Sequence, residues 1–184
     1  MGLKLVGGSA KGRKLKGPKK GGIRPASARV RKSVFDILGN LAGQNVLDLF
    51  AGTGSMGMEA LSKGAREVTF VDLDSHAIDL LFHNLRTTGF LKSTRILKKS
   101  ATAAIASLSK KKQAYDLIFL DPPYDQGQVE QCLKKMHRYN VLKDDGLLLC
   151  EHSPRETITF LGGLEVVDER KYGQTIVTFL KKAP

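Results

Sequence analysis

The stretch NVLDLFAGTGSMG, residues 45–57, joins an apolar strand to a glycine-rich turn and the start of a helix. Gly52, Gly54 and Gly57 match the pattern G-x-G-x-x-G, which brings backbone amides close to a ligand at such a turn. Strand and helix patterns then alternate through most of the remaining chain. This alternation predicts an α/β fold, a three-layer sandwich with a mostly parallel seven-stranded sheet. Ligands of such folds bind beyond the carboxyl ends of the strands.

The element boundaries follow from apolar runs and their spacing. We expect strands at residues 46–50, 68–72, 95–98, 116–121, 146–151, 164–169 and 174–181. We expect helices at residues 27–41, 55–63, 75–88, 100–109, 127–139 and 154–161. The last two strands have no helix between them, which indicates a C-terminal antiparallel hairpin. Two short alternating stretches near the start predict a small β-hairpin, so we expect a basic extension over residues 1–24 and an α/β domain over residues 25–184.

Positive charge is concentrated at the start of this 184-residue chain, whose formal net charge is +12. Residues 1–35 hold eleven Lys and Arg residues and no acid, and the rest is nearly neutral. A polyanion is the simplest partner for such a segment, with a solubilising tail or an anionic membrane as alternatives. No apolar stretch is long enough to span a bilayer and no secretory signal is evident. We therefore expect a cytoplasmic protein without membrane contact.

Two aspartates place negative charge beside the glycine-rich turn. Asp48 lies inside the strand before the turn, where it repels the phosphates of a dinucleotide and suits a cationic ligand. Asp72 ends the next strand, where an acid can hold both hydroxyls of a ribose. A nucleoside with a positive end and no phosphate satisfies both acids, and S-adenosylmethionine is such a ligand. A nicotinamide dinucleotide and a turn without a ligand are the alternatives.

Asp121-Pro122-Pro123-Tyr124 follows the apolar run at residues 117–120. Proline has no N–H to donate and holds φ near −65°, so the chain must leave the sheet there. The turn offers a carboxylate, carbonyl acceptors and an aromatic face in one place. That set suits a flat heterocycle with an exocyclic amino group, and a purely structural turn is the alternative.

With these motifs in this order, the chain resembles class I S-adenosylmethionine-dependent methyltransferases. More narrowly, it is similar to the bacterial 16S rRNA (guanine-N2)-methyltransferase family. The resemblance is carried by Gly7-Gly8-x-x-x-Gly12-Arg13-x-Leu15, Arg24-Pro25-x-x-x-Arg29-Val30-Arg31, Phe35-x-Ile37-Leu38, the stretch from Asp48 to Ala65, and Asp121 to Tyr124. It runs over essentially the whole chain.

The resemblance implies a Rossmann-like methyltransferase fold and methyl transfer from S-adenosyl-L-methionine to the exocyclic N2 of a guanine, with S-adenosyl-L-homocysteine as product. It implies cofactor contacts from Asp48, Phe50, Gly52, Gly54, Asp72, Leu73, Ser100 and Ala101. Asp121, Pro122 and Tyr124 would hold the guanine, with Asp121 polarising its amine and Tyr124 stacking on the base. Phosphates of 16S ribosomal RNA, free or in the small ribosomal subunit, would contact Arg13, Arg24, Arg29 and Arg31.

Other acceptors and a non-catalytic role stay open at this point. The turn at residues 121–124 also suits the N6 of adenine, another nucleic acid or a protein amide, and a module that only binds RNA is a further alternative. The histidines and the two cysteines show no metal-ligand spacing, so we expect no metal. We expect a monomer.

Overall fold

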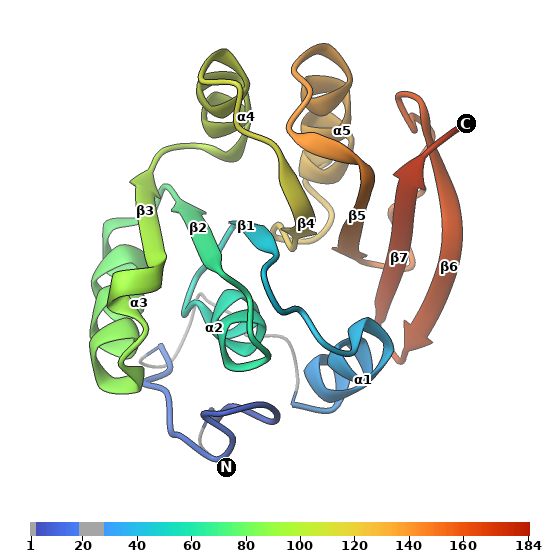
Figure 1. Cartoon of the computed structure of the whole chain (residues 1–184). Coiled ribbons are helices and arrows are strands. Elements are labelled where there is room, and N and C mark those ends of the chain that lie inside the picture. Colours follow the sequence, from blue (N-terminus) through green and yellow to red (C-terminus); the bar gives the residue numbers. More distant parts are fainter. Residues whose placement is uncertain (1–2, 19–27) are drawn as a thin grey trace. The chain divides into compact units, whose positions relative to one another are not determined.

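The computed structural model describes residues 3–18 and 28–184 (Figure 1). The chain divides into two compact units, residues 1–98 and 99–184. We call these the first unit and the second unit. Residues 3–18, which we call the N-terminal segment, belong to the first unit. In the part of the chain that the structure describes, no helix has the length and apolar character needed to cross a membrane.

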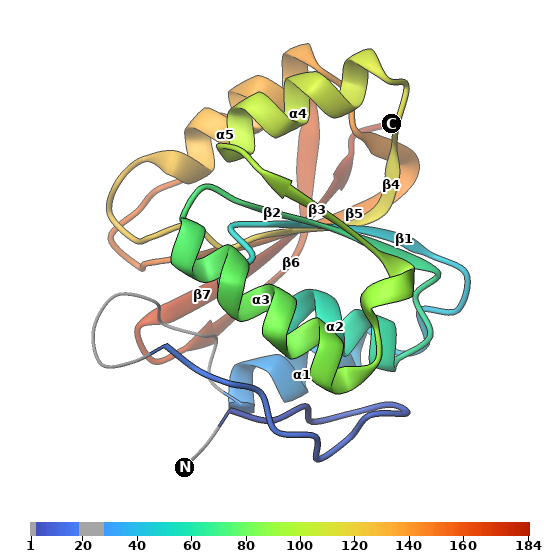
Figure 2. The ribbon, with the colours of Figure 1, turned by 90° about the vertical axis from the view of Figure 1, so that its left-hand side faces the viewer.

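The first unit is built on three parallel strands in the order β3-β2-β1. The strands are β1 (Asn45–Leu49), β2 (Glu67–Asp72) and β3 (Thr94–Lys98). The helices are α1 (Ala28–Leu38), α2 (Ser55–Ser62) and α3 (Ser75–Thr88), and a 3-10 turn covers Leu91–Ser93. Within this unit α2 and α3 lie along one face of the strands (Figure 2).

Close packing between α2 and β2 depends on a glycine. The strands β1 and β2 are almost continuously buried, as their apolar sequences predict. A Cβ on Gly57 of α2 would lie 2.2 Å from the ring of Phe70 in β2. Only glycine allows this approach, so the third glycine of the G-x-G-x-x-G pattern is explained by helix-to-strand packing.

The helix ends of the first unit follow local signals. Asp74 caps α3, since its Oδ1 accepts a hydrogen bond from the N–H of Ala77 at 2.9 Å. The helix predicted over residues 27–41 begins outside the described residues and ends at Leu38, three residues earlier than expected. Gly39 has φ of 66°, the left-handed conformation that commonly terminates helices.

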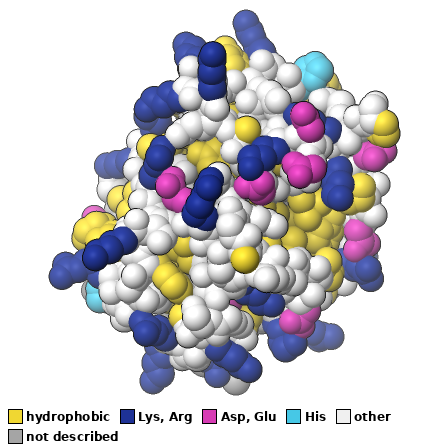
Figure 3. All heavy atoms as spheres, in the orientation of Figure 1, with side chains coloured by type: hydrophobic (Ala, Val, Ile, Leu, Met, Phe, Trp, Pro, Cys, Tyr) yellow, Lys and Arg dark blue, Asp and Glu magenta, His cyan; other side chains and the backbone are white. Residues whose placement is uncertain are grey.

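The N-terminal segment forms a reduced version of the predicted hairpin. Lys4 and Lys14 make one antiparallel bridge, the N–H of Leu5 donates to the Arg13 carbonyl at 3.0 Å, and the side chains of Leu5 and Leu15 are buried. The bases of this segment that stand exposed are Lys4, Lys11, Arg13, Lys14 and Lys16. Figure 3 shows dark-blue Lys and Arg side chains over this segment. The segment is therefore anchored by leucines and presents its bases to solvent.

The second unit contains four strands in the order β4-β5-β7-β6. They are β4 (Tyr115–Leu120), β5 (Leu142–His152), β6 (Leu164–Tyr172) and β7 (Thr175–Lys182). β4 and β5 are parallel, while β7 runs antiparallel to both β5 and β6. The predicted C-terminal hairpin is therefore confirmed, with Gly173 at φ 64° in its turn. The helices α4 (Ala101–Lys110) and α5 (Gln128–Arg138) contact each other.

The helix predicted over residues 154–161 is wrong. The described structure has a turn at Pro154 and Arg155, irregular backbone over residues 156–161, and a second turn at Gly162 and Gly163 directly before β6. Thr157, Ile158 and Thr159 are β-branched and lose side-chain freedom in a helix, which disfavours propagation beyond one turn. The remaining predicted helices and all seven strands are confirmed to within a few residues, and with them the mostly parallel α/β class.

Candidate functional site

The turn after β1 is locked by its own backbone. The N–H of Ala51 donates to the Val71 carbonyl at 2.9 Å, and the N–H of Gly54 donates to the Ala51 carbonyl at 2.7 Å. Gly54 has φ of 77°, and a Cβ there would lie 2.3 Å from Leu81 Cδ1. Positive φ and lack of space together exclude any side chain at this position. We call residues 50–54 the cofactor turn.

Phe50 opens the cofactor turn in a strained conformation. Its φ is 63°, in the left-handed region that bulky residues avoid at a cost of about 1–2 kcal/mol. The surrounding hydrogen bonds hold the residue in this state. Strain of this kind is concentrated at functional sites, and contact of Phe50 with a cofactor stays a prediction.

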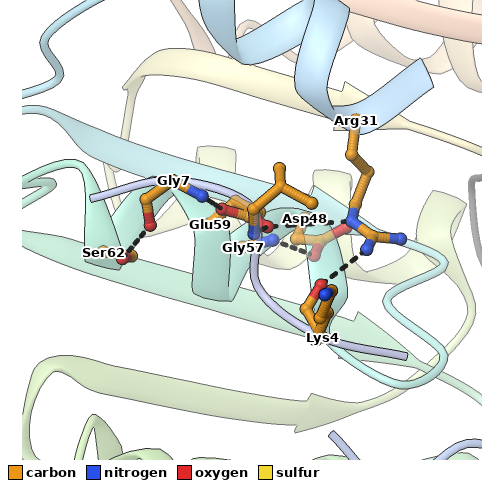
Figure 4. Close-up of polar contacts among 8 residues, drawn as sticks. Lys4, Gly7, Arg31, Asp48, Gly57, Glu59 and Ser62 are labelled. Carbon is orange, nitrogen blue, oxygen red and sulfur yellow. Dashed lines mark hydrogen bonds and ion pairs between the residues drawn. The ribbon is translucent and has the colours of Figure 1, made fainter. Parts of the chain in front are cut away.

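Asp48 is a buried carboxyl group directly before the cofactor turn. It is 2% exposed, and its Oδ2 accepts a hydrogen bond from the N–H of Gly57 at 2.9 Å (Figure 4). Burial raises the pKa of Asp48 to about 7, and the nearby charge of Asp72 acts in the same direction, while the Gly57 hydrogen bond opposes both. Ionisation of Asp48 is costly in this buried place. A cationic ligand group beside it would stabilise the carboxylate and would itself be bound more tightly.

Asp72 is held in place by the turn that it faces. Its Oδ2 accepts from the N–H of Gly52 at 2.8 Å, and its Oδ1 accepts from the N–H of Asp74 at 2.9 Å. Each carboxylate oxygen keeps a further lone pair, so the oriented group can still receive two ribose hydroxyls. Leu73 follows with 65% of its surface exposed, which provides an apolar face beside the carboxylate.

These residues of the first unit fit S-adenosylmethionine by their chemistry. A buried carboxyl poised near neutrality suits a positive amino-acid end, and an oriented surface carboxylate suits a ribose. Neither group suits a pyrophosphate, which favours the sulfonium nucleoside over the dinucleotide considered from sequence.

In the second unit, Ser100 and Ala101 stand at the start of α4. The Ser100 hydroxyl accepts from the N–H of Ala103 at 3.3 Å and so caps the helix, while Ala101 is buried. The hydroxyl oxygen has a second lone pair that can accept from an adenine amino group. Contact of Ser100 and Ala101 with the cofactor stays a prediction.

The turn at residues 121–124 follows β4, as predicted, and its aromatic ring is tethered. The Tyr124 hydroxyl donates to Glu151 Oε1 at 2.7 Å and lies 2.9 Å from Thr175 Oγ1. Burial is the main cause that raises the pKa of Tyr124 well above its ordinary value, with Glu151 and Asp121 adding to it. The phenol therefore stays protonated, and its hydrogen bonds set the orientation of the ring. Pro122 is buried and Asp121 is partly exposed.

Glu151 and Thr175 were not predicted from sequence. They belong to β5 and β7, which pair antiparallel. A signal for one of them existed, because Glu151 is an acid directly after the apolar run at residues 147–150. A charged residue at that place needs a partner, and Tyr124 is one.

The expectation that Arg31 contacts RNA phosphates is wrong. Its side chain is fully buried; Nη2 donates to the Lys4 carbonyl at 2.9 Å, and Nε lies 3.8 Å from Glu59 Oε1 (Figure 4). Glu59 also accepts from the backbone N–H groups of Val6 and Gly7. Arg31 and Glu59 thus fasten α1 and the N-terminal segment to α2, a structural role that needs a buried, hydrogen-bonded pair.

The other predicted RNA contacts have different surroundings. Arg29 is exposed on the first turn of α1. Arg13 is exposed too, but its Nη1 donates to the Thr88 carbonyl at 2.9 Å, which satisfies the carboxyl end of α3. Arg24 lies outside the described residues. Contact of these three arginines with RNA stays a prediction.

Comparisons with known proteins identify relatives of this chain. YlbH, a candidate rRNA methyltransferase of Bacillus subtilis (strain 168), is 35% identical over 182 residues, covering 98% of this chain and 99% of that protein. Ribosomal RNA small subunit methyltransferase D of Escherichia coli (strain K12) is 32% identical over 152 residues, covering 81% of this chain and 74% of that protein.

The fold prediction is confirmed by a solved structure. The candidate methyltransferase yhhF of Escherichia coli matches with a TM-score of 0.83 and 27% identity, covering 99% of this chain and 98% of that one. The family described as "Conserved hypothetical protein 95" matches residues 3–181. The chain therefore belongs to the Conserved hypothetical protein 95 family.

Proposed function

We propose that this protein is an S-adenosylmethionine-dependent methyltransferase that modifies the exocyclic N2 of a guanine in 16S ribosomal RNA. Relatives named ribosomal RNA small subunit methyltransferase D support the RNA substrate. The observation that carries the choice of an amine acceptor is the turn after β4, where Asp121 and the tethered ring of Tyr124 stand together. The protein acts as a monomer in the cytoplasm.

S-adenosylmethionine, when bound, supplies an electrophilic methyl group on a positively charged sulfur. Asp48 would hold its cationic amino-acid end, Asp72 its ribose, and Leu73 the face of its adenine. Asp48 is buried, and a bound cation offsets part of the cost of ionising it, so binding and ionisation of this group assist each other.

The acceptor needs positioning more than activation, because a guanine amine is unprotonated at neutral pH. The Asp121 carboxylate and the Pro122 carbonyl accept the two N2–H groups and stabilise the positive charge that develops on nitrogen. The proton that N2 loses passes to the carboxylate of Asp121. The ring of Tyr124 stacks on the base, and its hydroxyl is anchored so that the ring stays in one orientation.

A guanine inside a helix cannot enter such a turn, so the substrate base is unpaired or flipped out. The exposed bases of the N-terminal segment and Arg29 hold neighbouring phosphates, which fixes the register of the RNA without reading its sequence.

The test is methyl transfer from radiolabelled cofactor to small-subunit rRNA. Asp121→Ala should abolish transfer and leave S-adenosylhomocysteine binding intact, because the residue contacts the acceptor alone. Asp125→Asn removes an exposed charge four residues along the same loop, keeps a side chain that tolerates the φ of 59° at this position, and should leave transfer unchanged. Equal activity of Asp121→Ala and wild type, or loss of cofactor affinity in Asp121→Ala, would refute the assignment.

A further inference from the structure

One buried side chain joins the cofactor turn to the N-terminal segment. Asn84 lies in α3 and is 1% exposed. Its Nδ2 donates to the Thr53 carbonyl and to the Lys16 carbonyl, both at 3.0 Å, and its Oδ1 accepts from the Lys16 N–H at 2.7 Å. All three residues belong to the first unit.

Toward the cofactor turn, Asn84 binds one of the two polar groups of the Thr53–Gly54 peptide. The Thr53 carbonyl and the Gly54 N–H belong to the same planar peptide unit. Asn84 binds the carbonyl, and the Ala51 carbonyl accepts from the N–H at 2.7 Å. Both polar groups of the Thr53–Gly54 peptide are therefore bonded, and the orientation of the turn depends directly on the position of the Asn84 amide.

On the side of the segment, Asn84 binds both backbone groups of Lys16, as a neighbouring strand would. The chain then continues through Pro18 into residues 19–27, whose sequence holds Lys19, Lys20 and Arg24. Lys16 is thus the last hydrogen-bonded anchor that these contacts provide before that basic stretch. A separate anchor holds the same segment on α2, where Ser62 Oγ accepts from the Ala10 N–H at 2.9 Å and donates to the Gly7 carbonyl at 2.6 Å.

We propose that Asn84 is a positioning residue that couples cofactor binding to RNA binding. This rests on the proposed function. A bound cofactor restrains the turn further and with it the Asn84 amide, and the amide then holds Lys16 at a lower ordering cost. By thermodynamic reciprocity, RNA that orders the segment raises the affinity of the turn for cofactor by the same factor.

The first experiment needs no RNA. Hydrogen exchange is measured on the full chain with and without S-adenosylhomocysteine, in the peptide that contains Lys16. Wild type should exchange about tenfold more slowly with the ligand, because the Lys16 amide then opens less often. Asn84→Ala should lose this protection, and Ser62→Ala should keep it, since Ser62 anchors the segment without touching the turn. Absence of protection in wild type overturns the proposal whatever the variants do.

The second experiment measures S-adenosylhomocysteine affinity with and without a small-subunit rRNA transcript. We expect RNA to tighten binding by about fivefold to tenfold in wild type and in Ser62→Ala, and by a factor of about one in Asn84→Ala. A merely structural role would weaken both ligands and leave this factor unchanged, and that result overturns the proposal. Protection at Lys16 without methylation of rRNA would refute the proposed function and support the link between the turn and Lys16. Methylation without protection would support the proposed function and refute the role of Asn84.

Discussion

Replacement of Asp48 by Asn should stabilise the protein at alkaline pH while it weakens cofactor binding. The carboxyl is 2% exposed, and burial raises its pKa to about 7 from its ordinary value of 3.8. At pH values between these two pKa values, the Asp48 carboxyl has lost its proton in the unfolded chain but keeps it in the folded chain. Folding therefore loses stability as pH rises from about 4 to about 7, and the loss is complete above the folded pKa.

The size of the effect follows from the pKa difference. The difference between the folded and the ordinary pKa of Asp48 corresponds to a penalty of about 4 kcal/mol above pH 7. The Asn side chain carries no charge, and its oxygen can still accept from the Gly57 N–H that now bonds Asp48 at 2.9 Å. Its amide hydrogens need partners in a buried place, which costs about 1–3 kcal/mol. The net gain at pH 8 is then about 1–3 kcal/mol.

Urea denaturation of the cofactor-free protein at pH 5 and pH 8 measures this. The free energy of unfolding of Asp48→Asn, relative to that of wild type, should rise by about 2–3 kcal/mol from pH 5 to pH 8, with unchanged m-values. Asp36→Asn is the control, because that exposed carboxylate accepts a hydrogen bond from Lys32, which lowers its pKa, and its loss should not stabilise at pH 8. A difference between Asp48→Asn and wild type that is the same at both pH values would refute the reasoning.

Three further outcomes are expected. Gly8→Ala should lower the free energy of unfolding by about 3 kcal/mol in thermal or urea denaturation, since φ is 70° and a Cβ would lie 1.9 Å from the Ser62 carbonyl oxygen. Gly12→Ala, where a Cβ meets open space, should lower it by about 1 kcal/mol, and equal losses would contradict the packing. Tyr124→Phe should slow methyl transfer by about tenfold at unchanged cofactor affinity, and wild-type rates would show that the tether is dispensable. Arg29→Gln should reduce the salt dependence of RNA binding by about one phosphate contact, while Arg31→Gln should lower stability and leave that slope unchanged; the reverse pattern would restore the original expectation for Arg31.

The strands and most helices could be predicted because their patterns are set by burial. The apolar run at residues 117–120 predicts a buried strand because it is short and ends in two prolines. The two C-terminal strands predict a hairpin because no helical spacing separates them. The helix predicted over residues 154–161 does not form, because Thr157, Ile158 and Thr159 are β-branched and disfavour a helix. Local propensity decided that segment.

Arg31 shows why charge alone misleads. It lies four residues before Phe35 and three before Val34, on the apolar stripe of α1, so the helical spacing placed it inside. Glu59 gives the matching signal, because it is an acid within the otherwise uncharged helix α2. Asn84 is a third case, since it lies on the buried face of α3 beside Leu81 and Leu85. Each of these buried polar groups requires partners, but the partners depend on distant segments that spacing does not identify.

Mass-spectrometric mapping of modified guanines in small-subunit rRNA, treated with the wild-type protein or with Asp121→Ala, tests the central claim most directly. We predict that N2-methylguanine forms at one position with the wild-type protein and at none with the variant. Methylation at an adenine, at another atom of guanine, or at equal levels with both proteins would contradict it.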